Sequence, residues 1–278
     1  MERLYVSLVN LLELAKVDYI NESTMTLEQF YQLLALFSGV GIVVFIALFF
    51  IKAGYGMFRT ERWGISVPNK TGWVLMEAPV FFVMLYLWWQ SGTGTDKVPF
   101  LFFLLFELHY FQRSFVFPFL IKGKSRMPIA ILLMGVVFNL LNGYIQGEWL
   151  FFLAPEDFYS PAYLQRASCW IGMLLFLTGM GINWHSDYVI RHLRKPGDTR
   201  HYLPEKGMYR WVTSGNYFGE LLEWTGFAIM TASPAAWVFV WWTFANLAPR
   251  AYAIRKKYRE EFGREAVGKR KCLIPYIF

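Results

Sequence analysis

The sequence predicts an all-α, polytopic membrane protein built as a bundle of seven transmembrane helices. Its 278 residues are 56% hydrophobic and 20% aromatic, which is more apolar surface than a soluble domain of this length could bury. Several apolar runs are also long enough to cross a bilayer, and the loops between them alternate in charge. We expect one domain over residues 1–278, since no repeat or linker divides the chain.

The expected spans follow from the apolar runs. Seven are predicted, near residues 28–52, 73–90, 98–121, 128–146, 165–190, 215–232 and 235–256. Runs such as 30–51 reach the roughly 20 residues that cross about 30 Å of hydrocarbon as a helix. Before them, residues 1–27 are expected to form an amphipathic interfacial segment, because Leu4, Leu8 and Leu11 recur at helical spacing.

The distribution of Lys and Arg predicts the orientation of the bundle. Basic residues are concentrated in loops 52–72, 121–127 and 190–214 and in the tail from residue 250. The intervening loops, 91–97, 147–164 and 232–235, are neutral or acidic. Because basic loops remain cytosolic, the N-terminus should lie outside or in a lumen and the C-terminus in the cytosol. This fits a bacterial inner membrane or the endoplasmic reticulum. Anionic lipid beside these loops explains the net charge of +7, so no nucleic-acid partner is expected.

Ionisable and amide side chains inside the predicted spans are candidates for a functional site, because they are costly in hydrocarbon. We single out Glu77, Glu107, His109, Arg113, Asn183, His185, Asp187, Asn216, Glu220 and Glu223. Asn183 and Asp187 are four residues apart, as are Asn216 and Glu220, so each pair shares a helix face. Most members lie near the cytosolic ends, which favours a polar cavity open to the cytosol. Spacing alone leaves open that they are hydrogen bonds and ion pairs between helices.

Several kinds of site are not expected. No Gly-rich nucleotide motif follows a strand, and Gly179 and Gly181 lie inside an apolar helix, where close helix packing is the expected role. The four histidines form no metal-binding pair, no serine triad is present, and Cys169 and Cys272 offer no disulfide framework. We therefore expect no metal, and any nucleotide would be held by the bundle itself.

Five segments of the chain carry a family resemblance. They are 109–116 (HYFQRSFV), 179–188 (GMGINWHSDY), 193–198 (LRKPGD), 214–224 (SGNYFGELLEW) and 273–278 (LIPYIF). In these segments, and from about residue 73 to the end, the chain resembles the membrane-embedded steroid 5-alpha-reductase family, the 3-oxo-5-alpha-steroid 4-dehydrogenases. The resemblance implies a seven-helix enzyme that uses NADPH to reduce the Δ4 double bond of a 3-oxo-Δ4-steroid, with hydride transfer to C5.

The resemblance also implies site residues. Tyr110 and Glu77, in segment 76–79 (MEAP), match the positions that meet the substrate's 3-keto group, where hydrogen bonds would stabilise the developing enolate. The C4 proton would come from water or a neighbouring donor. The cofactor positions are Asn183, Asp187, Arg194, Asn216, Glu220, Arg113, Arg250, Tyr258 and Arg270. Lys195 beside Arg194 is suited to the 2′-phosphate of NADPH, and loop 190–214 is a candidate lid.

The chain departs from the family pattern at a few positions. Gln112 replaces a histidine, Phe117 and His201 each replace a tyrosine, and the histidine cluster after Arg250 is missing. Two other functions therefore stay open: a membrane methyltransferase that uses S-adenosylmethionine, and a non-catalytic lipid-binding or transport protein. The expected partners are a lipophilic, steroid-like substrate and the bilayer, with the chain as a monomer. Glu107 and His109 receive no role.

Overall fold

A computed structural model describes residues 23, 25–51, 54, 58, 63–95, 97–122, 125–195, 198 and 200–278. The predicted interfacial segment 1–27 lies largely outside these residues. The long helices are α2 Leu27–Phe50, α3 Asn69–Ser91, α4 Lys97–Phe111, α6 Ile129–Glu148, α7 Ala167–Arg191, α8 Gly215–Thr231 and α9 Pro234–Phe262. The shorter elements are η3 Gln112–Val116, α5 Phe117–Leu120, η4 Trp149–Leu153, η5 Pro161–Gln165, η6 Gly207–Arg210 and α10 Arg264–Val267.

The helical membrane architecture is confirmed, although the number of spans is confirmed only in part. Among the residues that the structure describes, five helical segments are long and apolar enough to cross a bilayer: Leu27–Phe50, Asn69–Ser91, Val98–Leu120, Ile129–Leu153 and Ala167–Arg191. Helices α8 and α9 form where the sixth and seventh spans were expected. However, α8 has only 17 residues, and α9 is densely charged after Arg250. Length and hydropathy therefore establish five candidate spans.

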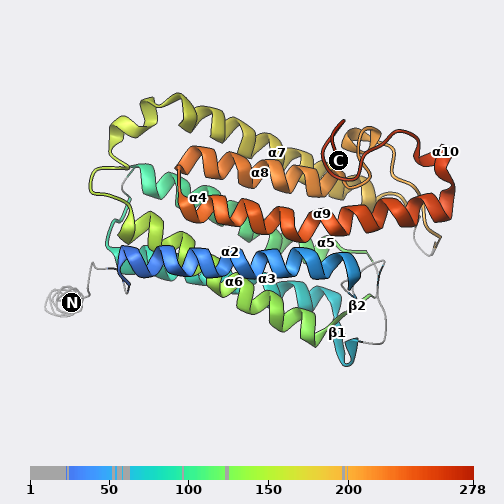
Figure 1. The fold of residues 1–278 in the computed structure, drawn as a ribbon, viewed down its shortest axis with the longest axis horizontal. Helices are drawn as coiled ribbons and strands as arrows, with labels where there is room; N and C mark the ends of the chain where they lie inside the picture. Colours follow the sequence, from blue (N-terminus) through green and yellow to red (C-terminus); the bar gives the residue numbers. More distant parts are fainter. Residues whose placement is uncertain are drawn as a thin grey trace, which may run out of the picture.

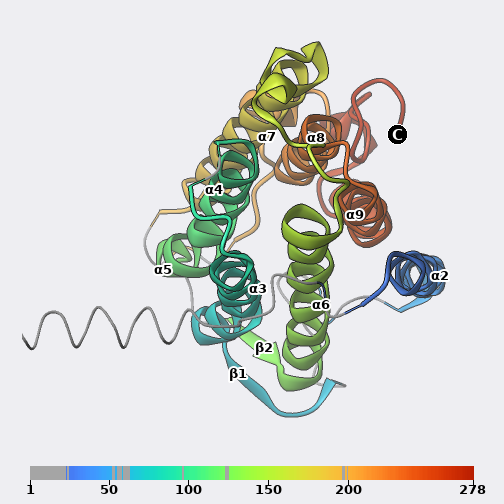
Figure 2. The same ribbon diagram turned by 90° about the vertical axis from the view of Figure 1, so that its left-hand side faces the viewer.

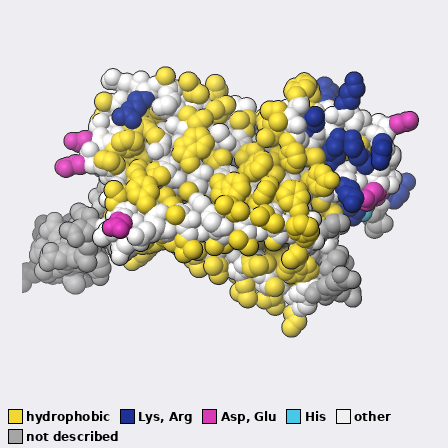
Figure 3. Space-filling model, in the orientation of Figure 1, with side chains coloured by type: hydrophobic (Ala, Val, Ile, Leu, Met, Phe, Trp, Pro, Cys, Tyr) yellow, Lys and Arg dark blue, Asp and Glu magenta, His cyan; other side chains and the backbone are white. Residues whose placement is uncertain are grey.

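The helices pack in pairs along one common axis (Figure 1). Helix α7 packs against α8, α3 against α6, and α2 against α9, while α8 also contacts α9. Seen end-on, α7, α8 and α9 form one side of the bundle, and α3, α4 and α6 form the other (Figure 2). Hydrophobic side chains cover the middle of the molecule, and most of the Lys and Arg side chains in view gather near α10 and the C-terminus (Figure 3). This end corresponds to the predicted cytosolic side.

Glycines bring the backbones of α7 and α8 into direct contact. A Cβ atom on Gly179 would lie 2.3 Å from the Glu223 backbone nitrogen, and one on Gly219 would lie 2.4 Å from that of Asn183. About two turns away the same contact recurs. A Cβ on Gly172 would lie 2.4 Å from the backbone nitrogen of Met230, and one on Gly226 would lie 2.3 Å from that of Phe176. The expectation of close packing is therefore confirmed for Gly179. Gly181 has nothing within 4 Å of its Cβ position, so it takes no part in this contact.

Two local features were not predicted from the sequence. Strands β1 Ser66–Pro68 and β2 Arg126–Pro128 pair antiparallel and lead directly into α3 and α6. The predicted third span is also interrupted by the π-helical turn η3, in which the Phe117 N–H donates to the Gln112 carbonyl five residues back. Pro118 explains this turn, because it has no N–H to donate to the carbonyl of Ser114. The extra residue in the turn re-aims the side chains that follow Tyr110.

Candidate active site

Tyr110 lies near the end of α4, with its side chain 3% exposed. Its ring packs against Phe106, His109 and Trp224, with centroids 4.8, 5.0 and 5.7 Å away. Its hydroxyl lies 3.1 Å from the Nδ2 atom of Asn142 on α6. Aromatic neighbours therefore hold the ring, and one polar contact fixes the hydroxyl.

A chain of buried amides on α6 determines the direction of that contact. The Nε2 atom of Gln146 donates to the backbone carbonyl of Ala235 (3.0 Å) and to Oδ1 of Asn142 (3.4 Å). A backbone carbonyl can only accept, so the Gln146 amide must point its nitrogen toward it. Asn142 then receives at Oδ1 and donates through Nδ2 to Tyr110. The Tyr110 oxygen is thus the acceptor, and within the described residues its own proton remains available for another group.

Glu77 occupies the neighbouring helix, α3, two residues before Pro79. Asn139 on α6 donates to the Met76 carbonyl at 2.7 Å and to Oε2 of Glu77 at 3.3 Å. The same face of α6 therefore holds both of the predicted catalytic side chains, Tyr110 through Asn142 and Glu77 through Asn139. Electrostatic interactions couple Tyr110 with Glu77, so the structure brings the predicted pair together.

A buried ion pair or hydrogen bond lies directly beside Tyr110. Nδ1 of His109 is 2.7 Å from Oε1 of Glu223 on α8, and the two residues are 6% and 0% exposed. The His109 ring also packs edge-on against Trp224, with centroids 4.6 Å apart. This contact, which sequence analysis left unassigned for His109, ties α4 to α8 next to the tyrosine. The carboxylate oxygens of Glu107, by contrast, have no hydrogen-bond partner within the described chain.

Arg113 connects the two polar groups. Its guanidinium lies over the rings of Trp73 and Phe117, at 4.5 and 4.7 Å from their centroids. Its Nη2 atom is 3.8 Å from Oε2 of Glu220. Arg113 is also close enough to Glu77 and to Asp187 to interact electrostatically with both. One cation therefore lies between the Tyr110 and Glu77 group and the acidic and amide residues of α7 and α8.

Those residues form a second cluster where α7 meets α8. Asn183 Nδ2 donates to the backbone carbonyl of Asn216 at 3.0 Å, and Asn216 Nδ2 donates to Oδ1 of Asp187 at 3.0 Å. Tyr209 from η6 covers the cluster and donates to Asn216 Oδ1 at 3.4 Å. Burial raises the pKa of Tyr209 well above its usual range, so this phenol stays a donor. Sequence analysis had not identified Tyr209.

Comparison with known proteins identifies the family of this chain. The profile of the family described as 3-oxo-5-alpha-steroid 4-dehydrogenase matches residues 125–278. The chain belongs to that family. It is 34% identical to 3-oxo-5-alpha-steroid 4-dehydrogenase 1 of Bos taurus over 243 residues, which are 86% of this chain and 93% of that protein. It is 33% identical to steroid 5-alpha-reductase DET2 of Gossypium hirsutum over 256 residues, covering 89% and 96%.

The human relative gives the same result. The chain is 35% identical over 241 residues to 3-oxo-5-alpha-steroid 4-dehydrogenase 1 of Homo sapiens, covering 86% of this chain and 92% of that protein. The predicted family and the enzyme class, an oxidoreductase acting on CH–CH groups, are therefore confirmed. The protein is a membrane reductase of the steroid 5-alpha-reductase family, and its buried polar clusters are the candidates for that chemistry.

The remaining cofactor candidates of this reductase are distributed over the C-terminal half. Arg194 and Lys195 are exposed after the end of α7. Arg194 is within electrostatic reach of Tyr258, which is 8% exposed. Arg250 lies on α9, next to Pro249. The structure thus brings Arg194 and Tyr258 close to each other, on the side of α9 that faces α8.

Arg270 joins two segments of the reductase through hydrogen bonds to backbone carbonyls. Its Nε donates to the Val267 carbonyl at 2.8 Å, its Nη1 to the Pro204 carbonyl at 2.9 Å, and its Nη2 to the Ala266 carbonyl. The guanidinium therefore fastens the loop before η6 to the C-terminal segment. Its predicted contact with the cofactor stays a prediction.

The described part of loop 190–214 is anchored rather than free. His201, at one of the positions that depart from the family pattern, places Nδ1 2.7 Å from Oε1 of Glu261 on α9. Asp198 accepts hydrogen bonds from Arg200 and Tyr202, which hold its pKa below the usual range. The loop reaches the cluster that contains Asn216 through Tyr209, whose hydroxyl donates to Asn216 Oδ1.

Three polar atoms beside this cluster are unsatisfied in the described structure. Nη1 of Arg191, Oγ of Ser186 and Oγ of Ser214 are buried and have no hydrogen-bond partner. Ser186 lies against the start of α8, since a Cβ on Gly215 would be 3.0 Å from its Oγ. The first N–H groups of a helix, two hydroxyls and a guanidinium suit a polar, anionic group. The residues present therefore fit a phosphorylated dinucleotide.

Proposed function

We propose that this reductase transfers a hydride from NADPH to C5 of a 3-oxo-Δ4-steroid, or of a similar lipophilic enone, and so reduces the C4–C5 double bond. The observation that supports this most directly is the Tyr110 hydroxyl. The amide chain from Ala235 through Gln146 and Asn142 makes its oxygen an acceptor, which leaves its proton free to be donated. A buried donor beside Glu77 is suited to a ligand carbonyl.

The reaction balances as one hydride added at C5 and one proton added at C4. Hydride addition at C5 moves electrons onto the 3-keto oxygen, which becomes enolate-like. Tyr110 donates a hydrogen bond to that oxygen, and the bond strengthens as negative charge develops. Protonation at C4 by a proton from solvent then gives the saturated ketone. Asn142 does not touch the substrate in this scheme and acts by holding the orientation of Tyr110.

Glu77 assists Tyr110 at the same carbonyl oxygen. Its carboxyl is positioned by Asn139, and it acts as a second donor when it carries a proton. The hydrophobic side chains around Tyr110, among them Phe106 and Trp224, exclude water. A low dielectric makes hydrogen bonds to a developing charge more effective than they are in water.

The cofactor end is assigned to the cluster at α7 and α8. NADPH, when bound, supplies the hydride. Asn183, Asp187, Asn216 and Glu220 would bind its ribose and amide groups, whereas the cations would bind its phosphates. These cations are Arg113, Arg191, Arg194, Lys195 and Arg250. Because Arg113 interacts with groups on both sides, it couples the cofactor end to the Tyr110 end.

We also propose that all seven long helices cross the membrane, with the N-terminus outside or in a lumen and the C-terminus in the cytosol. Helix α8 is short, but it packs between α7 and α9, so protein rather than lipid surrounds most of it. Helix α9 has 29 residues, about 43 Å at 1.5 Å per residue, so its charged second half can project beyond a hydrocarbon layer of about 30 Å. The basic end seen in Figure 3 would face the cytosol.

Purified full-length protein should test the reaction directly. With NADPH and a panel of 3-oxo-Δ4-steroids, we expect NADPH oxidation in step with formation of the 5α-reduced product, and slower oxidation of NADH. The same steroids lacking the double bond are the control and should give no turnover. Binding and methyl transfer from S-adenosylmethionine would instead support a methyltransferase. Ligand binding without NADPH oxidation would support a lipid-binding protein.

The variant Asn142→Asp should give an unusual dependence of turnover on pH. An ionised carboxylate only accepts hydrogen bonds, so Tyr110 would have to donate its proton to Asp rather than to the substrate. A protonated Asp donates again, as Asn142 does. We therefore expect kcat to fall by about a hundredfold at high pH and to recover as the pH is lowered, across roughly pH 5 to 9.

Two matched variants separate this effect from a loss of packing. Asn142→Leu removes the contact but leaves the Tyr110 proton free, so it should reduce kcat by less than about tenfold at every pH. Asn139→Asp changes the amide one turn away, which contacts Glu77 and not Tyr110. If Asn142→Asp behaved like wild type at all pH values, or if Leu were the worse substitution throughout, the positioning role of Asn142 would be wrong.

A further inference from the structure

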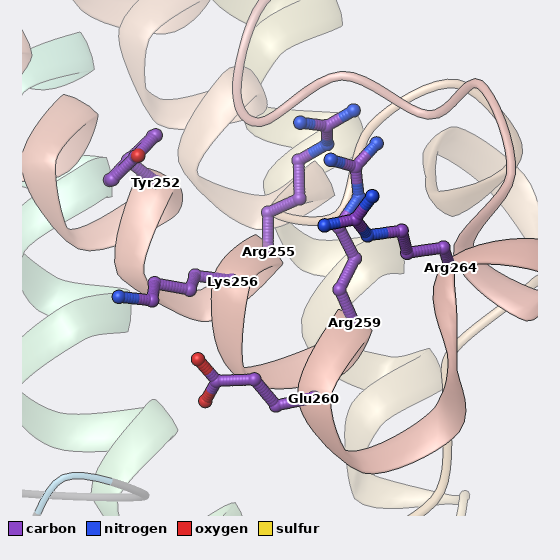
Figure 4. A pocket seen from close by; sticks show the side chains of 6 residues that line it. All are labelled: Tyr252, Arg255, Lys256, Arg259, Glu260 and Arg264. Atoms are coloured by element: carbon purple, nitrogen blue, oxygen red, sulfur yellow. The ribbon is translucent and has the colours of Figure 1, made fainter.

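A pocket of about 290 Å³ lies at the far end of α9, away from the clusters described above (Figure 4). It is lined by Tyr252, Arg255, Lys256, Arg259, Glu260 and Arg264. Four of these side chains are cationic and one is a carboxylate. Figure 4 shows the guanidinium groups of Arg255, Arg259 and Arg264 gathered close together. Like charges held this close repel one another, so the pocket is arranged for an anionic partner.

Two of these arginines differ in their hydrogen bonds to the protein. Nε of Arg255 donates to the Arg270 carbonyl at 2.7 Å, and its side chain also interacts with the Cys272 thiol, so its position is fixed. Nε of Arg259 is buried and has no hydrogen-bond partner in the described residues. Phosphate oxygens are suited to such a group, because a guanidinium binds them through two parallel hydrogen bonds.

This pocket is separate from the cofactor cluster. On a helix with 3.6 residues per turn, positions 252, 255 and 259 fall within a sector of about 60°, Arg250 lies on the opposite side, and Tyr258 lies about a quarter of a turn from the middle of that sector. Tyr258 is buried toward the bundle, whereas Tyr252 is 48% exposed. A ligand in the pocket would therefore approach from the outer surface of α9 and not from the interior.

The pocket begins at the level where the apolar part of the bundle ends. The ring of Tyr252 packs against Phe49, with centroids 6.1 Å apart, and Phe49 is next to the last residue of the apolar helix α2. Arg255 and Arg259 follow Tyr252 by about 5 and 10 Å along the helix axis, at 1.5 Å per residue. The polar headgroup layer extends roughly 5 to 8 Å beyond the hydrocarbon on each side. The arginines thus reach the depth of lipid phosphates.

We propose that this pocket binds the phosphate of an anionic phospholipid headgroup in the leaflet at this end of the molecule. Tyr252 lies at the membrane interface, and Arg255, Arg259 and Arg264 bind the phosphate, with Lys256 contributing to the positive potential. Basic pockets at the cytosolic side of helices are a known kind of headgroup site. The proposal concerns a site outside the reaction centre, so it stands or falls independently of the reductase activity.

The full-length chain in lipid nanodiscs tests the proposal. In phosphatidylcholine with increasing phosphatidylglycerol, the wild-type protein should retain phosphatidylglycerol through delipidation, measured by mass spectrometry of the bound lipid. The double variant Arg259→Gln/Arg264→Gln should bind it at least about tenfold more weakly. Lys70→Gln is the matched control, since Lys70 is an exposed cation at the start of α3, at the same end of the bundle, and should behave as wild type.

Three outcomes would overturn the proposal. Equal retention of phosphatidylglycerol by the double variant would show that these arginines do not hold the lipid. Equal losses in Lys70→Gln would reduce the effect to the general basic charge of this surface. Inorganic phosphate, titrated in phosphatidylcholine alone, identifies the alternative source: tight binding of phosphate with no preference for phosphatidylglycerol would make this a site for a soluble anion. If the double variant does not fold, the single variant Arg264→Gln replaces it in this test, because it changes only an exposed side chain.

Discussion

Replacing Tyr110 by phenylalanine is expected to reduce kcat for an enone steroid by about 10² to 10³, while the dissociation constant for NADPH stays close to that of the wild type. Loss of one preorganised donor to a developing oxyanion has an effect of this size. The ring contacts with Phe106, His109 and Trp224 do not involve the hydroxyl, so the fold should be retained. Steady-state kinetics would measure the fall in kcat, and fluorescence would measure the dissociation constant for NADPH.

Tyr31→Phe is a suitable control, because Tyr31 is an exposed tyrosine on α2 and should show unchanged kinetics. Combining Tyr110→Phe with Asn142→Asp provides a sharper test. If Asn142 acts only through the tyrosine hydroxyl, Asn142→Asp should have little further effect once that hydroxyl is gone. Additive losses would mean that Asn142 acts by another route, and undiminished turnover of Tyr110→Phe would remove the tyrosine from the mechanism.

Replacing Gly179 by alanine should destabilise the protein strongly, although the change adds a single methyl group. That methyl would lie 2.3 Å from the Glu223 nitrogen and 2.6 Å from the Gly219 carbonyl oxygen. Both are backbone atoms of α8 and cannot turn aside, so the two helices would have to separate. We expect a loss of about 2 to 3 kcal/mol, measured as a lower thermal unfolding midpoint in detergent.

Gly181→Ala makes the same chemical change two residues further along α7. No atom lies within 4 Å of its Cβ position, so the higher helix propensity of alanine should leave stability unchanged or raise it by up to about 1 kcal/mol. Similar losses in both variants would contradict the close contact of α7 with α8. NADPH affinity should also fall in Gly179→Ala, because separation of the helices moves Asn183 away from Asn216.

Several features of the protein were correctly predicted from the sequence. The apolar runs identified the helices, because a segment in lipid must satisfy its backbone hydrogen bonds internally. Costly polar side chains in those runs made Glu77, Asn183, Asp187 and Asn216 candidates, and the resemblance added Tyr110; the structure places these residues in two neighbouring clusters. The family followed from the order of short motifs. The two strands at 66–68 and 126–128 were missed, since three residues carry too little pattern.

Other features depend on contacts between residues that are distant in the sequence. Asn139, Asn142 and Gln146 share a face of α6, and their spacing inside an apolar run was a signal that could have been used. Their direction, however, depends on the Ala235 carbonyl of another helix. Similarly, the sequence did not indicate a partner for His109, and the structure shows that Glu223, on another helix, lies 2.7 Å from it.

There is a physical reason why some features could be predicted from the sequence and others could not. The sequence by itself determined which segments enter the membrane and which side chains are too polar to be there without a partner, because both depend on the transfer of single groups from water. Only the tertiary structure decided which partner each polar group found. Hydrogen bonds are directional, and the fixed carbonyl of Ala235 is what makes the Tyr110 oxygen an acceptor and leaves its proton available for donation.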